Sequence, residues 1–281
     1  MDPTPSQKRQ KSRARRDHIK PEGYLRGFVP DKPDHEQKPL WACYISPPPI
    51  QTNRPTLKWI PQSPSEVSIQ IGWYDYSPDS TPDETADQAF AKLKREVTPV
   101  RDAIRNERYR TWRHHLPFLL RYGHMLQVRS ELYREDVGGS SPNMPHPKNY
   151  SITRMREELK KGPNEMWSSF QWTLRFCRDP SDPFITGDSA PVISGEVDDP
   201  NLILTDLRTR CLCPFGWDMA LLGRVDPWPR DLGECEPSEL DFYRRRVSEM
   251  ARRYLVSPRD ISDRLDVRIR RVDPLRERER N

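Results

Sequence analysis

Alternating hydrophobic and polar positions predict strands near the start of the chain and again in its last third. Val67–Ile71 (VSIQI) alternates in the way a half-buried strand does, and Leu40–Ile45 is a short apolar run that ends near three consecutive prolines. The β-prone runs of the last third are Phe184–Thr186, Leu202–Thr205, Arg210–Cys213 and Trp217–Leu222. We expect the last two runs to pair across residues 214–216.

The stretch between these two regions has the spacing of helices. Thr81 and Glu84 form a capping box with Pro82 at the first helical position, which predicts a helix that starts at Thr81. Its apolar stripe recurs every three or four residues: Ala86, Phe90, Leu93, Val97, Val100 and Ile104. Pro99 is expected to kink this helix. The same kind of spacing predicts further helices over residues 111–135, 151–177 and 238–254.

The order strand–strand, helices, strands, helix is typical of an α+β fold, in which several helices pack against a mostly antiparallel sheet. The chain has 281 residues, which is enough for one large domain. We predict a single domain over residues 18–257, with a flexible loop near residues 136–148, where Gly, Ser and Pro are concentrated. A disordered basic arm over residues 1–17 precedes the domain, and a charged tail over residues 258–281 follows it.

The excess of positive charge is most evident in the basic arm. The net charge of the chain is +5, and residues 1–17 contain six Lys and Arg residues without apolar periodicity. We interpret this arm as a solvated tail. A nuclear-localisation signal and a contact to the phosphates of a nucleic acid are the alternatives.

The apolar segments predict neither a membrane span nor secretion. No apolar run approaches the roughly 18 residues that a transmembrane helix needs, and the first ten residues lack the apolar core of a signal peptide. The five cysteines are irregularly spaced, so we expect buried, reduced thiols. The chain is therefore predicted to be intracellular, either cytoplasmic or nuclear, and to have no membrane partner.

Two motifs resemble those of a known family. His18–Phe28 (HIKPEGYLRGF) is similar to the pattern H-x-V/I-P-x-x-Y-L followed by Phe, with Lys20 where an apolar residue is usual. Thr186–Val192 (TGDSAPV) is similar to the motif T-S-D-N-P-V, with one residue inserted. Together with weaker matches in the same order, residues 18–257 resemble the family labelled domain of unknown function 4238. The resemblance implies no established activity.

Polar residues of these motifs, combined with two helical positions, predict a metal-dependent site. His18, Glu96 and Asp188 would supply an imidazole and two carboxylates to a divalent metal, Mg²⁺ or Mn²⁺, that activates water. Arg26 and Arg129 would hold a phosphate through their guanidinium groups. This set of residues predicts a metal-dependent phosphodiester hydrolase of the nuclease type, and the basic arm would contact its nucleic-acid substrate.

Each of the three proposed metal ligands also has a structural interpretation. His18 can bridge a turn through both ring nitrogens, Glu96 can form a partly buried pair with an arginine, and Asp188 can accept backbone N–H groups in a turn. The alternative function is then a non-enzymatic protein that binds nucleic acid or another partner. Convergence of the three side chains at an accessible pocket would favour the enzyme.

Overall fold

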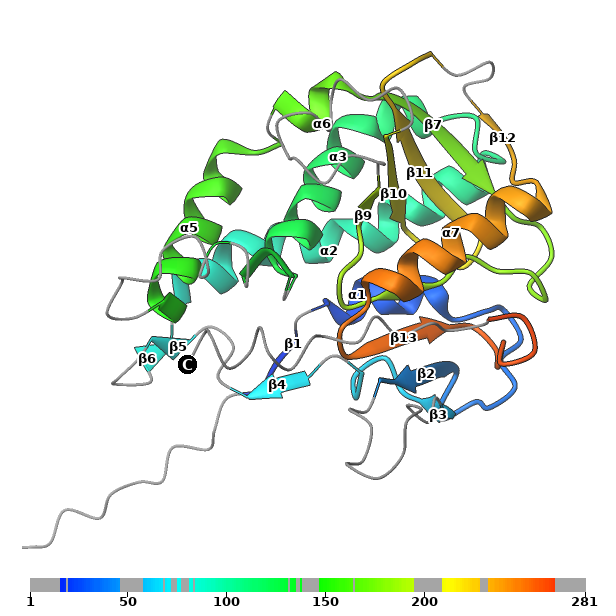
Figure 1. The fold of residues 1–281 in the computed structure, drawn as a ribbon, viewed down its shortest axis with the longest axis horizontal. Coiled ribbons are helices and arrows are strands. Elements are labelled where there is room, and N and C mark those ends of the chain that lie inside the picture. Colours follow the sequence, from blue (N-terminus) through cyan, green and yellow to red (C-terminus); the bar gives the residue numbers. More distant parts are fainter. Residues whose placement is uncertain are drawn as a thin grey trace, which may run out of the picture.

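The computed structural model describes residues 16–18, 20–45, 58–67, 69–71, 75–76, 81–82, 84–130, 132–134, 137, 147–163, 165–194, 209–227 and 232–265. Within these residues the chain has an α+β fold, in which helices pack against mostly antiparallel sheets, as the order of elements predicts (Figure 1). None of the helices in these ranges combines the length and the apolar content that crossing a bilayer requires.

The larger sheet has five strands in the order β12-β7-β11-β10-β9. These strands are β7 (Gln171–Phe176), β9 (Val192–Ser194), β10 (Arg210–Pro214), β11 (Met219–Arg224) and β12 (Leu232–Glu234). Neighbouring strands are antiparallel except β12 and β7, which are parallel. β10 and β11 form the predicted hairpin, with Cys213 opposite Leu221.

A second sheet has four strands in the order β3-β2-β13-β8 and lies beside the first (Figure 1). Its strands are β2 (Leu40–Tyr44), β3 (Lys58–Gln62), β8 (Thr186–Gly187) and β13 (Tyr254–Ser257). Two short pairs complete the strands: β1 (Arg16–His18) with β4 (Ile69–Ile71), and β5 (Asp75–Tyr76) with β6 (Thr81–Pro82). The predicted strand at Leu40 is confirmed, and its centre is buried because β3 and β13 cover both edges.

The helices divide into two groups around the larger sheet (Figure 1). The first group contains α2 (Glu84–Asn106), α3 (Trp112–Val128), α5 (Pro147–Lys161) and α6 (Glu165–Ser169). The second contains α7 (Pro237–Met250), which crosses the opposite face, and the short α1 (Glu22–Leu25) lies near the smaller sheet. The predicted apolar stripe of α2 is confirmed, because Phe90, Val97 and Ile104 are all buried.

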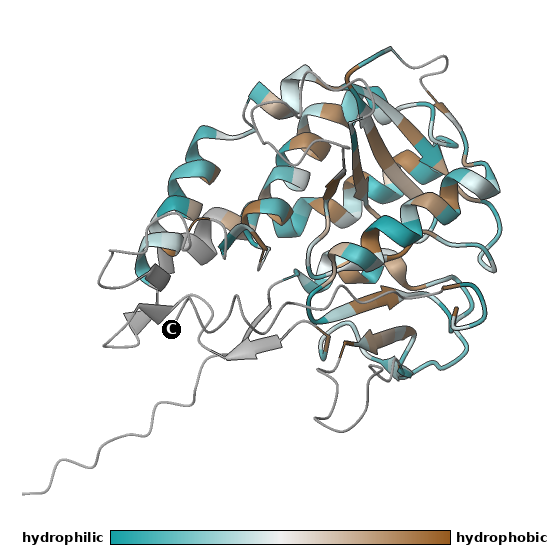
Figure 2. Ribbon diagram, in the orientation of Figure 1, coloured by the Kyte–Doolittle hydropathy of each residue, from teal (hydrophilic) through white to brown (hydrophobic). Residues whose placement is uncertain are grey.

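Alternate residues of the central strands enter two different apolar clusters. On β11, Met219 and Leu221 pack with the α2–α3 side, whereas Ala220 and Leu222 pack with α7. Successive side chains of a strand point to opposite faces, so this sheet is buried on both sides. Figure 2 shows the same division, with brown apolar residues on the strands and on the inward surfaces of the helices. The five cysteines are free and buried, which confirms their interpretation as packing thiols.

Three predicted helix boundaries are wrong. The helix predicted to reach residue 177 ends before it, and residues 171–176 instead form strand β7, because pairing with β11 and β12 satisfies their backbone. The helix predicted to begin at Thr81 begins at Glu84, since Thr81 and Pro82 pair with β5. The last helix ends at Met250 rather than Tyr254, whose backbone joins β13.

The described parts of both predicted tails belong to the folded domain. Arg16 and Asp17 of the basic arm belong to β1, and residues 1–15 lie outside the described residues. Residues 258–265 pack on the domain, because Ile261 is completely buried and Arg264 contacts Asp182 at 3.1 Å. Most of the predicted loop over residues 136–148 and the tail after residue 265 lie outside the described residues.

The helical turn at the start of the domain is enclosed by the rest of the fold. Tyr24 and Phe28 have no exposed surface, and the carbonyl of Gly27 accepts a hydrogen bond of 3.0 Å from the backbone N–H of Trp217. A Cβ atom at Gly27 would overlap the guanidinium of Arg101 and would lie 2.5 Å from the carbonyl oxygen of Phe215. Glycine is therefore required by close packing at this position.

Gly27→Ala is expected to lower the free energy of unfolding by about 2–3 kcal/mol, because overpacking against a backbone carbonyl forces the main chain to shift. Urea denaturation followed by tryptophan fluorescence measures the change. Gly23→Ala is the matched control, since its Cβ would meet nothing closer than the carbonyl oxygen of Lys94 at 3.3 Å. Equal stability of the two variants would contradict the close packing assigned to Gly27.

Candidate functional site

The residues of the two family-like motifs meet in a buried cluster of charges. Lys20 lies two residues before α1, Asp188 follows β8, and Arg129 follows the last residue of α3. All three side chains are completely buried. The charges of Asp188 and Arg129 both act on the pKa of Lys20, in opposite directions, so the three groups share one electrostatic environment.

Asp188 is held by the backbone of a distant segment. Its carboxylate accepts hydrogen bonds from the backbone N–H groups of Arg252, at 3.0 and 3.3 Å, and of Arg253, at 3.2 Å. Its own N–H donates to the carbonyl of Tyr254. The carboxylate therefore stabilises the short connection between α7 and β13, which is the structural role that the alternative interpretation assigns to it.

Lys20 spans two segments through its ammonium group. The Nζ atom donates to the carbonyl oxygen of Leu126 at 3.1 Å and also to that of Ala190. Burial lowers the pKa of Lys20 from 10.5 to about 7, and the nearby carboxylate of Asp188 opposes this shift. An ammonium in this position links the start of α1 to the end of α3 and to the segment between β8 and β9.

The two arginines predicted to bind phosphate occupy different environments. Arg129 is buried, and its guanidinium lies 4.2 Å from the centre of the Phe90 ring, in the geometry of a cation–π contact. Arg26 is exposed and pairs with Glu22 one helical turn earlier, at 2.6 Å. The structure thus places the Arg129 side chain in the interior and the Arg26 side chain at the surface, and their joint contact to a phosphate stays a prediction.

The structure places the three predicted metal ligands on three elements. Glu96 lies half-buried on α2, and its carboxylate has neither a hydrogen bond nor the expected arginine partner among the described residues. The backbone of His18 pairs with Ile69, and the His18 side chain lies outside what the structure describes. Among the side chains that are described, no three His, Cys, Asp or Glu residues form a group that could hold a metal ion. The Mg²⁺ or Mn²⁺ site stays a prediction.

A second candidate site is the basic surface formed by α2, α3 and the turn between them. Between residues 90 and 128 the sequence has nine Lys and Arg residues against three Asp and Glu residues. Within the part of the chain that the structure describes, five of these cations are exposed and form no ion pair or side-chain hydrogen bond. We call them the unpaired surface cations: Lys92, Arg95, Arg108, Arg110 and Arg121. By contrast, exposed or half-exposed cations on other elements are often paired, as Arg154 is with Glu157 and Arg246 is with Glu249.

The turn between α2 and α3 is joined to the larger sheet through Asp218. This buried carboxylate accepts two hydrogen bonds from Arg105, at 2.7 and 2.5 Å, and one from the hydroxyl of Tyr109, at 3.0 Å. Burial raises the pKa of the Tyr109 hydroxyl, and the charge of Asp218 and its hydrogen bond raise it further. The position of this turn, which contains Arg108 and Arg110, relative to the sheet is thus set by buried bonds.

Sequence reasoning missed both the buried charge of Lys20 and the unpaired surface cations. The signal for Lys20 was present, because a lysine stands where the family motif has an apolar residue. The cations of α2 and α3 carry no motif, and their lack of partners becomes visible only when the neighbouring carboxylates are located in space.

Comparison of the chain with models of known families, with curated proteins and with solved structures finds no match. The family resemblance therefore stays a prediction that rests on residues 18–28 and 186–192.

Asp188→Asn is expected to lower the free energy of unfolding by about 3 kcal/mol, because it removes the buried charge beside Lys20 and weakens the bonds to two backbone N–H groups. Thermal and urea denaturation measure the loss. Asp102→Asn is the matched control, since this aspartate on α2 is half-exposed, with a relative side-chain exposure of 52%. Unchanged stability of the Asp188 variant would contradict the structural role assigned to this carboxylate.

Comparison of the wild type with Lys20→Met is expected to show how the lowered pKa of Lys20 makes the free energy of unfolding depend on pH. Between the folded pKa of about 7 and the unfolded value of 10.5, the unfolded chain retains a proton that the folded chain has released. Stability of the wild type relative to the methionine variant therefore rises with pH across this window, by at most about 1.4 kcal/mol per pH unit. Below pH 7 Lys20 is protonated in both states, so the difference in the free energy of unfolding no longer changes with pH and includes the full cost of burying the ammonium.

Urea denaturation at intervals from pH 6 to pH 9.5 measures this difference. Lys160→Met is the control, because Lys160 is exposed on α5 and its ammonium stays in water in both states. A pH-independent difference between wild type and Lys20→Met would contradict the assigned environment of Lys20.

Proposed function

We propose that this protein binds nucleic acid through the basic surface of α2 and α3, and that the cluster around Lys20 and Asp188 has a structural role. The observation that carries the proposal is the set of five unpaired surface cations. A guanidinium already bonded to a carboxylate offers fewer donors to a phosphate, whereas these side chains keep all of theirs.

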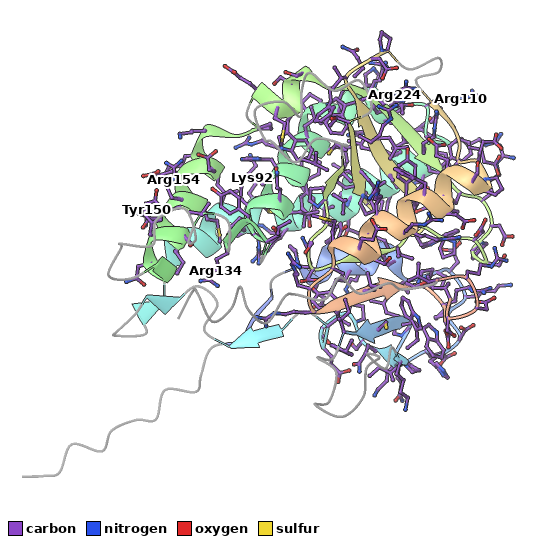
Figure 3. The ribbon with its side chains drawn as sticks, in the orientation of Figure 1. Lys92, Arg110, Arg134, Tyr150, Arg154 and Arg224 are labelled. Carbon is purple, nitrogen blue, oxygen red and sulfur yellow. The ribbon has the colours of Figure 1, made fainter. Side chains whose placement is uncertain are left out.

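The dimensions of this surface favour a polymer over a single phosphate group. α2 has 23 residues, so its axis is about 34 Å long at 1.5 Å per residue. Lys92 lies toward the end of the helical layer near α5, and Arg110 lies at the opposite edge of the molecule (Figure 3). A nucleic acid presents phosphates at regular intervals over such a length, and binding releases the counterions condensed on it.

The geometry gives less support to the metal-dependent phosphodiester hydrolase. Asp188 is completely buried and its carboxylate is bonded to backbone N–H groups, so it is poorly placed to exchange ligands with a solvent metal. Arg129 is equally enclosed. The proposed binding function needs neither residue to reach a substrate, and the predicted basic arm adds positive charge for the same partner.

Combined substitution of Arg95→Glu and Arg121→Glu is expected to weaken nucleic-acid binding at least tenfold, since two cations are replaced by two anions. Fluorescence anisotropy with labelled 20-residue oligonucleotides, single-stranded and duplex, measures the affinity of the full chain at several salt concentrations. The dependence on salt should also become shallower, by about 0.9 in logarithmic slope for each lost contact to duplex phosphate.

The matched control combines Lys38→Glu and Arg245→Glu, which change the net charge equally at exposed, unpaired cations outside α2 and α3. It should bind more tightly than the first double variant. An equal loss of affinity in the two double variants would show that only net charge matters, and it would contradict binding through α2 and α3. Poly-glutamate that competes as well as an oligonucleotide would indicate an acidic protein partner.

A further inference from the structure

The turn between α2 and α3 holds two consecutive residues in an unusual backbone conformation. Arg108 has φ 49° and Tyr109 has φ 66°, although neither is glycine or asparagine. L-residues with side chains are sterically disfavoured in this left-handed region. Such a conformation persists only where the surrounding structure over-determines it, and it is often found at functional sites.

Tyr109 is fixed from two directions. Its hydroxyl donates to Asp218 at 3.0 Å, and its backbone N–H donates to the carbonyl of Ile104 at 2.7 Å. Its ring stacks on Phe176, with ring centres 4.7 Å apart and an interplanar angle of 5°. The ring therefore has one face against Phe176, and its orientation is set by bonds to the larger sheet.

Two of the unpaired surface cations flank Tyr109 in the sequence. Tyr109 remains partly exposed, and Arg108 and Arg110 on either side of it are exposed. Arg110 lies at the edge of the molecule (Figure 3). A rigid, partly exposed aromatic ring flanked by free guanidinium groups is the combination that single-stranded nucleic acids contact, with a base on the ring and the backbone phosphates on the cations.

We propose that Tyr109 is a stacking site for a base of single-stranded nucleic acid, and that Arg108 and Arg110 contact the adjacent phosphates. This inference rests on the proposed function and narrows its substrate class. Bases of a duplex are already stacked on one another, so only an unpaired strand can place a base on Tyr109. The strained backbone of the turn presents the ring in a fixed orientation and thereby lowers the entropy lost on binding.

The test compares two labelled 20-residue strands that carry the same phosphates, oligo-dT and an abasic strand of the same length. The full chain is expected to bind oligo-dT about tenfold more tightly than the abasic strand, which corresponds to one stacked base. Tyr109→Ala is expected to bind oligo-dT no better than the abasic strand, while its affinity for the abasic strand stays within about twofold of the wild type. Fluorescence anisotropy measures all four affinities.

Two further variants separate stacking from folding. Tyr109→Trp keeps a flat aromatic surface and is expected to retain the preference for oligo-dT, even if the alanine variant is unstable. Tyr44→Ala is the matched control, because Tyr44 is an exposed tyrosine on β2, and it should leave both affinities unchanged.

Three outcomes would overturn the inference: equal binding of the two strands by the wild type, a preference for oligo-dT that survives in Tyr109→Ala, or the same loss of preference in Tyr44→Ala. In each of these cases the proposed contact to phosphates could still hold, and it would be seen as binding to the abasic strand. Absence of binding to either strand and to the duplex would instead contradict the proposed function itself.

Discussion

The attraction between Lys20 and Asp188 in the interior connects parts of the fold that are far apart in sequence. Lys20 bonds to carbonyls at the end of α3 and between β8 and β9, and Asp188 bonds to the connection between α7 and β13. Burying either charge alone would cost several kcal/mol, but here each charge has the other nearby and has backbone partners. The Lys20 ammonium therefore holds the segment before α1 against the end of α3 and the connection between β8 and β9.

This cluster also explains why the two sharpest sequence motifs belong together. One motif contributes Lys20 and Tyr24, and the other contributes Thr186 and Asp188. The hydroxyl of Tyr24 lies 2.9 Å from that of Thr186 and donates to the carbonyl of Pro214 at 2.8 Å, so hydrogen bonds join the motifs directly. Lys20, Tyr24, Thr186 and Asp188 thus bond within the interior, where unsatisfied polar groups are costly.

Charged residues of α2, α3 and the turn between them differ in whether they have a partner in the fold. Asp218 uses its oxygens on Arg105 and Tyr109, which fixes the turn between α2 and α3, and it leaves Arg108 and Arg110 to the solvent. The same basic segment thus contains arginines that stabilise the fold and arginines that remain available to a partner. An unpaired surface cation costs little while water solvates it, and it can bind phosphate without first breaking an internal ion pair.

The sequence by itself determined the α+β class, the buried stripe of α2 and the β10–β11 hairpin, because periodicity and turn residues act locally. It did not determine that residues 171–176 form a strand, since Phe170, Leu174 and Cys177 have the spacing of an apolar helix stripe, and only pairing with β11 and β12 makes that segment a strand. Nor did it determine which charges are enclosed. Lys20 and Asp188 are 168 positions apart in the chain, and only the tertiary structure decided that they share one low-dielectric environment, while Arg26, six positions after Lys20, remains in water.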